Sequence, residues 1–212
     1  MALRRCLALF ALCFALAAEA SLPAIVDTVQ SPAWRVRDNV AEPLRPGMPV
    51  QNGDRVKTGS GARVYLKLPE GSTVKLGESA LLFYSVPPTT AEAVFRGALD
   101  VAAGASRFTT SALAKLRRRD VSIRVGTATI GIRGTDVWGR ARADEDLVML
   151  IEGQVEVKSA DGTSFDLKEP MATYLAPREK APAGLAMATA DEFAARAAET
   201  EIAAGAGALS GK

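Results

Sequence analysis

The chain has 212 residues, with 26 lysines and arginines against 24 aspartates and glutamates, and a formal net charge of +2 at pH 7. This near balance gives no global field that would favour nucleic acid or an anionic membrane as a partner. The chain has no histidine, and its two cysteines are Cys6 and Cys13. The composition therefore excludes histidine-based zinc or copper sites and every catalytic triad that uses histidine.

Residues 1–20 have the three regions of a secretory signal peptide. Arg4 and Arg5 form a positive n-region, Leu7 to Ala18 are apolar, and Ala18-Glu19-Ala20 supplies the small residues of a cleavage site. The apolar run is shorter than the roughly 20 residues that a membrane-spanning helix needs. We therefore expect cleavage near Ala20, a periplasmic or secreted location, and no membrane anchor after cleavage. Both cysteines lie in this segment, so the mature chain would have no disulfide.

Residues 21–49 are expected to form short N-terminal strands that lead into a β-domain at residues 50–176. In that domain apolar and polar residues alternate, which is typical of strands with one buried face. Clear examples are Ala62–Leu68 and Val121–Val125. Two short segments also recur, which predicts a repeated unit made of a glycine turn and a short strand. Phe95–Val101 resembles Ile151–Val157, and Gly71–Leu76 resembles Gly162–Leu167.

The composition changes after residue 176. Residues 177–188 are rich in proline and alanine and are expected to form a linker, and residues 189–203 to form a helix capped by Thr189 or Asp191. Residues 204–212 are rich in glycine, alanine and serine and are expected to be disordered. Because many short strands follow one another without a long helix, we predict an all-β fold. It would be a β-solenoid-like or sandwich stack of short strands, with a short C-terminal α-helix.

Two segments carry the residues best suited to a partner surface. They are a basic cluster, Lys115, Arg117, Arg118 and Arg119, and the turn G-I-R-G-T-D, which contains Arg133 and Asp136. The cluster favours an acidic partner, or it is a solvated loop. The turn could present backbone N–H groups to a phosphate, but no Lys-Ser/Thr follows it, so a tight turn between two core strands is the simpler interpretation. In such a turn Arg133 and Asp136 would pair with each other or cap the local backbone.

Other candidate sites have weaker patterns. Asp144-Glu145-Asp146 lacks the spaced oxygen ligands of a calcium loop and better fits an exposed hairpin tip. The carboxylate pair of a glycoside hydrolase leaves no motif, and nothing selects one pair here. Four aromatic residues would either line a sugar-binding platform or pack in the core and over the surface: Trp34, Tyr65, Tyr84 and Trp138. No catalytic, cofactor-binding or metal-binding residue is predicted.

Four motifs, taken in chain order, resemble the FecR domain family. Gly53–Leu76 contains the run G-D-R-V-K-T-G, an alternating strand and the turn E-G-S. Phe95–Val101 resembles the central element of the family, and Thr127–Val137 resembles its strand entry. Ile151–Val157 resembles its closing E-G-x-V-x-V. The resemblance covers about Val50 to Leu175.

The resemblance implies a compact, solenoid-like stack of short strands whose role is protein contact. The best-known members of the family are inner-membrane regulators, in which an anti-sigma segment and a transmembrane helix precede a periplasmic FecR domain. That domain reads the state of an outer-membrane iron–siderophore receptor. Together with the signal peptide, this predicts a stand-alone, exported FecR-domain protein without the anti-sigma segment.

The leading hypothesis is a non-enzymatic periplasmic binding or sensing module that makes protein–protein contacts in envelope signalling. Its partner would be an envelope protein, either an outer-membrane receptor or an inner-membrane sensor. The alternative is a carbohydrate- or peptidoglycan-binding domain, and a hydrolase that uses carboxylates is a third hypothesis. No cofactor, metal or nucleic-acid partner is expected.

Overall fold

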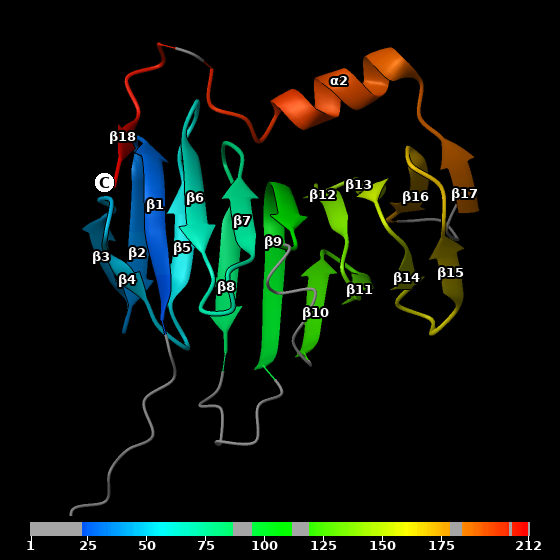
Figure 1. Cartoon of the computed structure of the whole chain (residues 1–212), viewed down its shortest axis with the longest axis horizontal. Helices are drawn as coiled ribbons and strands as arrows, with labels where there is room; N and C mark the ends of the chain where they lie inside the picture. Colours follow the sequence, from blue (N-terminus) through cyan, green and yellow to red (C-terminus); the bar gives the residue numbers. More distant parts are fainter. Residues whose placement is uncertain (1–22, 87–94, 112–118, 179–183, 204, 212) are drawn as a thin grey trace, which may run out of the picture.

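The computed structural model describes residues 23–86, 95–111, 119–178, 184–203 and 205–211, without the side chains of residues 95, 96 and 119. The expected signal peptide at residues 1–20 therefore lies outside the described part of the chain. The described residues form two open layers of short strands joined through one long strand, with one short helix near the C-terminus (Figure 1). This confirms the predicted all-β fold.

The first layer, sheet A, has the order β18, β1, β6, β7, β9, β12, β13, β16 and β17, and β4 also pairs with β1. The bounds of these strands are β1 Ala24–Gln30, β4 Pro49–Val50, β6 Arg63–Lys67, β7 Thr73–Leu76, β9 Phe95–Thr109, β12 Asp136–Ala141, β13 Glu145–Glu152, β16 Ala172–Pro177, β17 Gly184–Met187 and β18 Leu209–Ser210.

The second layer, sheet B, has the order β3, β2, β5, β8, β9, β10, β11, β14 and β15. Its other strands are β2 Ala33–Arg37, β3 Val40–Pro43, β5 Arg55–Thr58, β8 Leu81–Ser85, β10 Arg119–Val125, β11 Ala128–Ile132, β14 Val155–Lys158 and β15 Ser164–Leu167. Among the described strands, β9 and β10 are parallel, and the other pairs in the two layers are antiparallel.

Strand β9 belongs to both layers because it crosses from one to the other near Gly104. Its first part pairs with β8 in sheet B, and its last residues pair with β7 in sheet A. Gly104 has φ +79°, and a Cβ built on it would lie 2.5 Å from the Cα of Ala80. Glycine is therefore required at this crossing, since any side chain would meet both an unfavourable backbone conformation and a neighbouring backbone.

The main core lies between the two layers and follows the alternation in the sequence. In β11 and β14 every second residue is buried, as expected for strands with one solvent-facing side. The core combines inward-facing residues of both sheets, for example Val64, Leu66, Val148, Ile130 and Val157. Aliphatic side chains from the two layers thus supply the main hydrophobic stabilisation.

One of the two sequence repeats corresponds to a repeated local structure. The hairpins β6–β7 and β14–β15 close in the same way. The N–H of Leu68 donates to the carbonyl of Ser72 over 2.8 Å, and the N–H of Ser159 donates to that of Thr163 over 2.9 Å. In both hairpins a glycine with positive φ, Gly71 or Gly162, supplies the turn. The other repeat has no such match, because Gly97 lies inside β9 whereas Gly153 lies between β13 and β14.

The described residues between 188 and 211, which we call the C-terminal strap, run along one side of the strand array from β17 to β18 (Figure 1). The helix α2 (Ala190–Ala198) is capped by Thr189 in a capping box with Glu192, one of the two predicted caps. It ends at Ala198 instead of about Ala203. This helix is nine residues long, and in the described part of the chain no helix is both long and apolar enough to cross a bilayer.

Two segments beside the helix contain more structure than expected. Residues 177–188, expected to be a linker, include β17, which pairs with β16. Residues 204–212, expected to be disordered, include β18, whose Leu209 and Ser210 pair with β1. The expectation of disorder is therefore wrong for these two residues. Composition did not reveal this pairing. The pairing arises because the strap brings residues 209 and 210 beside β1, and not because of their local β-propensity.

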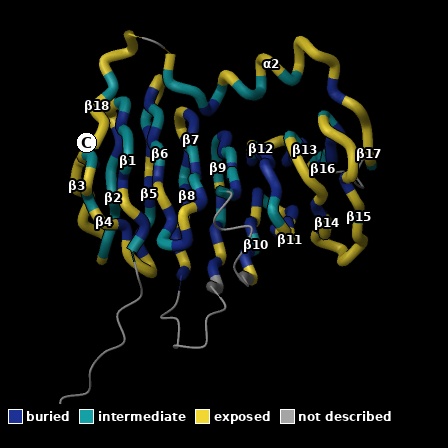
Figure 2. The backbone as a smooth tube through the Cα atoms, in the orientation of Figure 1, coloured by how far each residue is buried: buried dark blue, intermediate teal, exposed yellow. Residues whose placement is uncertain are grey.

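A second, smaller apolar cluster lies on the outer face of sheet A. It is formed by Trp138, Leu147 and Met149, and Phe193 of α2 packs against it. Figure 2 shows buried positions on β12 and β13 beneath the strap, while α2 itself is coloured intermediate or exposed. Strands β12 and β13 are thus buried on both faces, which explains why this part of the sequence reads as a nearly continuous apolar run.

Candidate functional site

The outer face of sheet B has a depression of about 450 Å³ where four strands lie side by side. Its lining residues come from β10, β11, β14, β15 and the residues at their ends. The polar and charged members are Asp120, Arg133, Gln154, Glu156, Asp166 and Lys168. This surface includes Arg133, one of the residues singled out in the sequence.

Gly131 is one of the residues that line the hollow. It lies in the middle of β11, opposite Ser122 of β10 and Glu156 of β14, on the side of the strand that faces solvent. A Cβ built at this position would meet no atom within 4 Å, and its φ is not in the left-handed region. The space above this glycine on the sheet surface is therefore not filled by other described residues of the chain.

Within the described part of the chain, Arg133 and Asp120 have no ion pair, unlike the other charged residues that line the depression. Lys168 lies 2.9 Å from Asp166, and Lys158 lies 4.0 Å from Glu156, which places these charges in exposed pairs. Arg133 is exposed and has no ion-pair partner among the described residues. A free guanidinium at the rim of a hollow can form two parallel hydrogen bonds to a carboxylate of another molecule.

Asp136 lies on the other sheet and does not pair with Arg133. Its carboxylate accepts hydrogen bonds from Nε and Nη2 of Arg107, over 2.9 Å and 2.7 Å, and from the hydroxyl of Thr109. The hydrogen bond to Asp136 is the main cause that raises the pKa of Arg107. The turn leads from β11 in sheet B to β12 in sheet A and so places Arg133 and Asp136 on different surfaces.

The basic cluster cannot be placed in the same detail. Lys115, Arg117 and Arg118 lie outside the described residues, and so does the side chain of Arg119. The backbone of β10 begins at Arg119, and the next residue, Asp120, lines the depression. The cluster is therefore joined in sequence directly to the surface that contains Arg133.

Sequence reasoning missed an ion cluster on the outer face of sheet A. Glu201 of the strap accepts hydrogen bonds from Nζ of Lys75 over 2.6 Å, from Nη1 of Arg107 over 3.0 Å and from the hydroxyl of Tyr65 over 3.0 Å. Burial alone would raise the pKa of Glu201, but these partners outweigh it and hold the pKa below its ordinary value. Arg107 and Glu201 are 94 positions apart, so no local pattern could connect them.

The four aromatic residues do not form a sugar-binding platform. Trp138 and Tyr84 are buried, and burial is the main cause that raises the pKa of Tyr84 far above its usual range. The hydroxyl of Tyr65 accepts a hydrogen bond from the N–H of Ile202, and Trp34 is half-buried on β2. Burial and these partners leave the four rings without a shared exposed face, which a stacking platform for sugars would need.

The three acidic residues at positions 144–146 do not share a common partner. Asp146 is buried and accepts hydrogen bonds from the backbone and hydroxyl of Thr127 and from Arg178. Glu145 faces Arg140, and Asp144 is exposed between β12 and β13. In the described part of the chain no three acidic, cysteine or histidine side chains are grouped as metal ligands would be. The hairpin is therefore held by ion pairs and hydrogen bonds.

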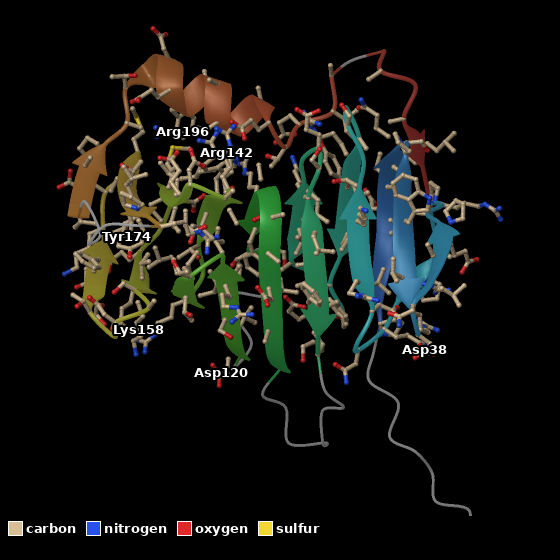
Figure 3. All side chains as sticks on the ribbon, turned by 180° about the vertical axis from the view of Figure 1, so that it is seen from behind. Asp38, Asp120, Arg142, Lys158, Tyr174 and Arg196 are labelled. Carbon is tan, nitrogen blue, oxygen red and sulfur yellow. The ribbon has the colours of Figure 1, made fainter. Side chains whose placement is uncertain are left out.

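Figure 3 shows how the two surfaces are separated. Asp120 and Lys158 lie on the side of the strand array away from α2, whereas Arg142 and Arg196 lie on the side where α2 crosses. This agrees with the pairing, which places Asp120 and Lys158 in sheet B, and with the contact of Arg196 to Met149 in sheet A.

Comparison with known proteins gives a family and one protein of related fold, which is represented by two crystal structures. Residues 54–156 match the family described as FecR protein, and this range runs from β5 to the first half of β14 and includes Gly131 and Arg133. No curated protein matches. Two crystal structures of a candidate anti-sigma factor from Parabacteroides distasonis ATCC 8503 share the fold, each with a TM-score of 0.54 and 16% identity over 66% of this chain.

The chain spans 63% of the first of these solved chains and 62% of the second. At this identity the likeness concerns the fold. The family match begins at Asp54, at the start of the motif that opened the resemblance in the sequence, and ends inside the closing strand. This chain therefore carries a FecR domain at residues 54–156.

Proposed function

We propose that this protein is a non-enzymatic binding or sensing module that makes protein–protein contacts in envelope signalling, and that it works in the periplasm after removal of residues 1–20. Its partner is an envelope protein, either an outer-membrane receptor or an inner-membrane sensor. The FecR domain supports a regulatory role, since the family is known for signalling regulators. The fold shared with a candidate anti-sigma factor supports the same class of function.

The observation that carries this proposal is the free guanidinium of Arg133 beside the depression over Gly131. The face is polar, most of its lining residues belong to the matched domain, and its hollow is open to another molecule. A partner loop that carries a carboxylate would fill the hollow and pair with Arg133. Such charged contacts mainly determine specificity and association rate, and the buried centre of the contact provides affinity.

The experiment compares two variants of this face with two matched controls. Tagged, mature-length protein is incubated with detergent-solubilised envelope extract, and the captured proteins are identified by mass spectrometry. Gly131→Tyr adds a large ring at a position where a Cβ would meet no atom within 4 Å, and Arg133→Glu reverses the charge at position 133. Lys57→Tyr and Lys57→Glu make the same changes at an exposed lysine of β5, in the other half of sheet B.

The expected result is one envelope protein that is captured by the wild type and by both Lys57 variants, and lost with Gly131→Tyr and Arg133→Glu. All four variants should keep the wild-type circular dichroism, because both sites are exposed. Capture that does not distinguish the variants would contradict the assignment of this face. Absence of any captured protein would contradict the proposed function itself.

A further inference from the structure

We propose that the outer face of sheet A is a second interaction surface, which the C-terminal strap covers within the chain and which takes an acidic amphipathic segment of a partner protein in the strap's place. This surface lies on the opposite sheet from Gly131. The strap also lies outside the matched FecR domain, which ends at residue 156. The inference therefore goes beyond the proposed function, and its test does not depend on the Arg133 face.

The first support is a row of cations on adjacent strands. Lys75 of β7, Arg107 of β9 and Arg140 of β12 all point to the outer side of sheet A and all meet carboxylates of the strap. Glu201 binds Lys75 and Arg107, and Glu199 accepts a hydrogen bond from Arg140 over 2.7 Å. The strap therefore satisfies the row with two carboxylates at i and i+2, a pattern that a segment of another protein can supply equally well.

The second support is the apolar cluster beside this row. Trp138 and Met149 are fully buried beneath α2, Phe193 packs against the cluster, and Nη1 of Arg196 lies 3.8 Å from the sulfur of Met149. Tryptophan, methionine and arginine are the residue types that are enriched at the centres of protein interfaces. A cation row beside an apolar patch complements a segment with carboxylates and one large apolar side chain.

The third support is that the strap covers the surface imperfectly. None of the residues of α2 is buried. Beneath it, Nε1 of Trp138 and Nε of Arg140 are buried without a hydrogen-bond partner among the described residues. A buried donor without an acceptor destabilises the arrangement that buries it. A segment that supplied acceptors to these two groups would bind more tightly than the strap does.

Gly77 offers a way to open the strap without changing any charge. A Cβ at this position would lie 2.7 Å from the backbone oxygen of Glu199, which is closer than real contacts allow. The nearest atom belongs to the surface-lying strap, and the next nearest, the Cβ of Ala105 in β9, would lie at 3.3 Å. Gly77→Val should therefore push Glu199 away from the sheet and shift the strap to an open state.

The experiment uses the full mature chain and a labelled peptide with the sequence of residues 188–203 as the probe. Binding is measured by fluorescence anisotropy. The apparent affinity should be about tenfold or more tighter for Gly77→Val than for the wild type, because the wild-type strap competes with the peptide. A peptide with Glu199→Lys and Glu201→Lys, and a peptide with Phe193→Ser, should bind neither protein. Polyglutamate should compete only weakly.

Several results would each overturn the proposal. The first is a folded Gly77→Val protein that binds the peptide no better than the wild type. The second is equal binding of the lysine peptide, because the surface would then not recognise the carboxylates. The third is full competition by polyglutamate, because the surface would then be a general anion site. If Gly77→Val does not fold, Glu201→Lys in the full chain opens the strap from its own side, with the same expected gain in affinity. If that variant also fails to fold, the strap cannot be displaced and the surface is never available.

Discussion

The carboxylate of Asp136 accepts three hydrogen bonds from its neighbours on the outer side of sheet A. Two nitrogens of Arg107 and the hydroxyl of Thr109 donate to it, and Arg107 also reaches Glu201. A bidentate arginine–carboxylate pair is geometrically specific, and here only 22% of the arginine side chain and 9% of the aspartate side chain are exposed. Asp136 therefore stabilises the junction between β9 and β12 and is unsuited to meeting a partner.

Replacing Asp136 with alanine should lower the free energy of unfolding by about 1–3 kcal/mol, since Arg107 would lose its main acceptor while remaining largely buried. Urea denaturation followed by circular dichroism measures this change. The control is Asp166→Ala, which removes one partner of the exposed pair with Lys168 and should leave the midpoint unchanged. Equal effects of the two substitutions would show that the Arg107 pair has no special role.

The difference between Arg133 and Asp136 also shows what local sequence could reveal. The G-I-R-G-T-D motif correctly predicted a turn that feeds a core strand, but the expected pairing of Arg133 with Asp136 was wrong. The partner of Asp136 comes from β9, 29 positions earlier, and only the pairing of β9 with β12 brings it near. Side-chain pairs of this kind depend on register between distant strands, which a single sequence does not specify.

The crossing of β9 between the layers depends on one glycine. Gly104→Ala should destabilise the protein by about 2–4 kcal/mol, because a left-handed residue with a Cβ costs 1–2 kcal/mol and forcing Cβ against Ala80 adds a comparable amount. The matched control is Gly131→Ala in β11, which has free space and an ordinary φ and should be neutral or slightly stabilising. Thermal unfolding of both variants measures the difference. A Gly104→Ala protein as stable as the control would contradict the tight crossing.

The strap should respond to acid through Glu201. Its pKa in the folded protein lies below the ordinary value of 4.5, so its contribution to stability is present above that pH and is lost as the pH falls through the folded pKa. We expect the amide of Ile202, which donates to Tyr65, to lose protection against hydrogen exchange below about pH 4.5 while β6 stays protected.

Glu201→Gln supplies the control for this acid response. The glutamine has no charge to lose, so the acid step at Ile202 should disappear and its protection should be low at every pH. NMR-detected hydrogen exchange between pH 3 and pH 7 makes the comparison. An unchanged acid step in the Glu201→Gln variant would mean that another group controls the strap.

The architecture was predictable where it depends on local alternation, and hidden where it depends on distant contacts. Strand periodicity, the glycine turns and the capping residue Thr189 indicated an all-β stack with a C-terminal helix. The crossing of β9 between two layers and the return of the strap to β1 were not predictable, because both depend on long-range pairing. The depression over Gly131 was missed for the same reason, since its lining residues come from four strands that lie in two separate parts of the sequence.

If contact through the outer face of sheet B is the role of this protein, a probe placed there must touch the partner in living cells. The measurement is photo-crosslinking with p-benzoylphenylalanine at position 154, where the exposed Gln154 lines the depression, compared with the same residue at position 57 on the far half of the same sheet. We expect irradiation to give one envelope-protein adduct from position 154, lost when Arg133 is changed to Glu, and none from position 57. No adduct at position 154, or the same adducts at both positions, would contradict the assignment of this face as the contact surface.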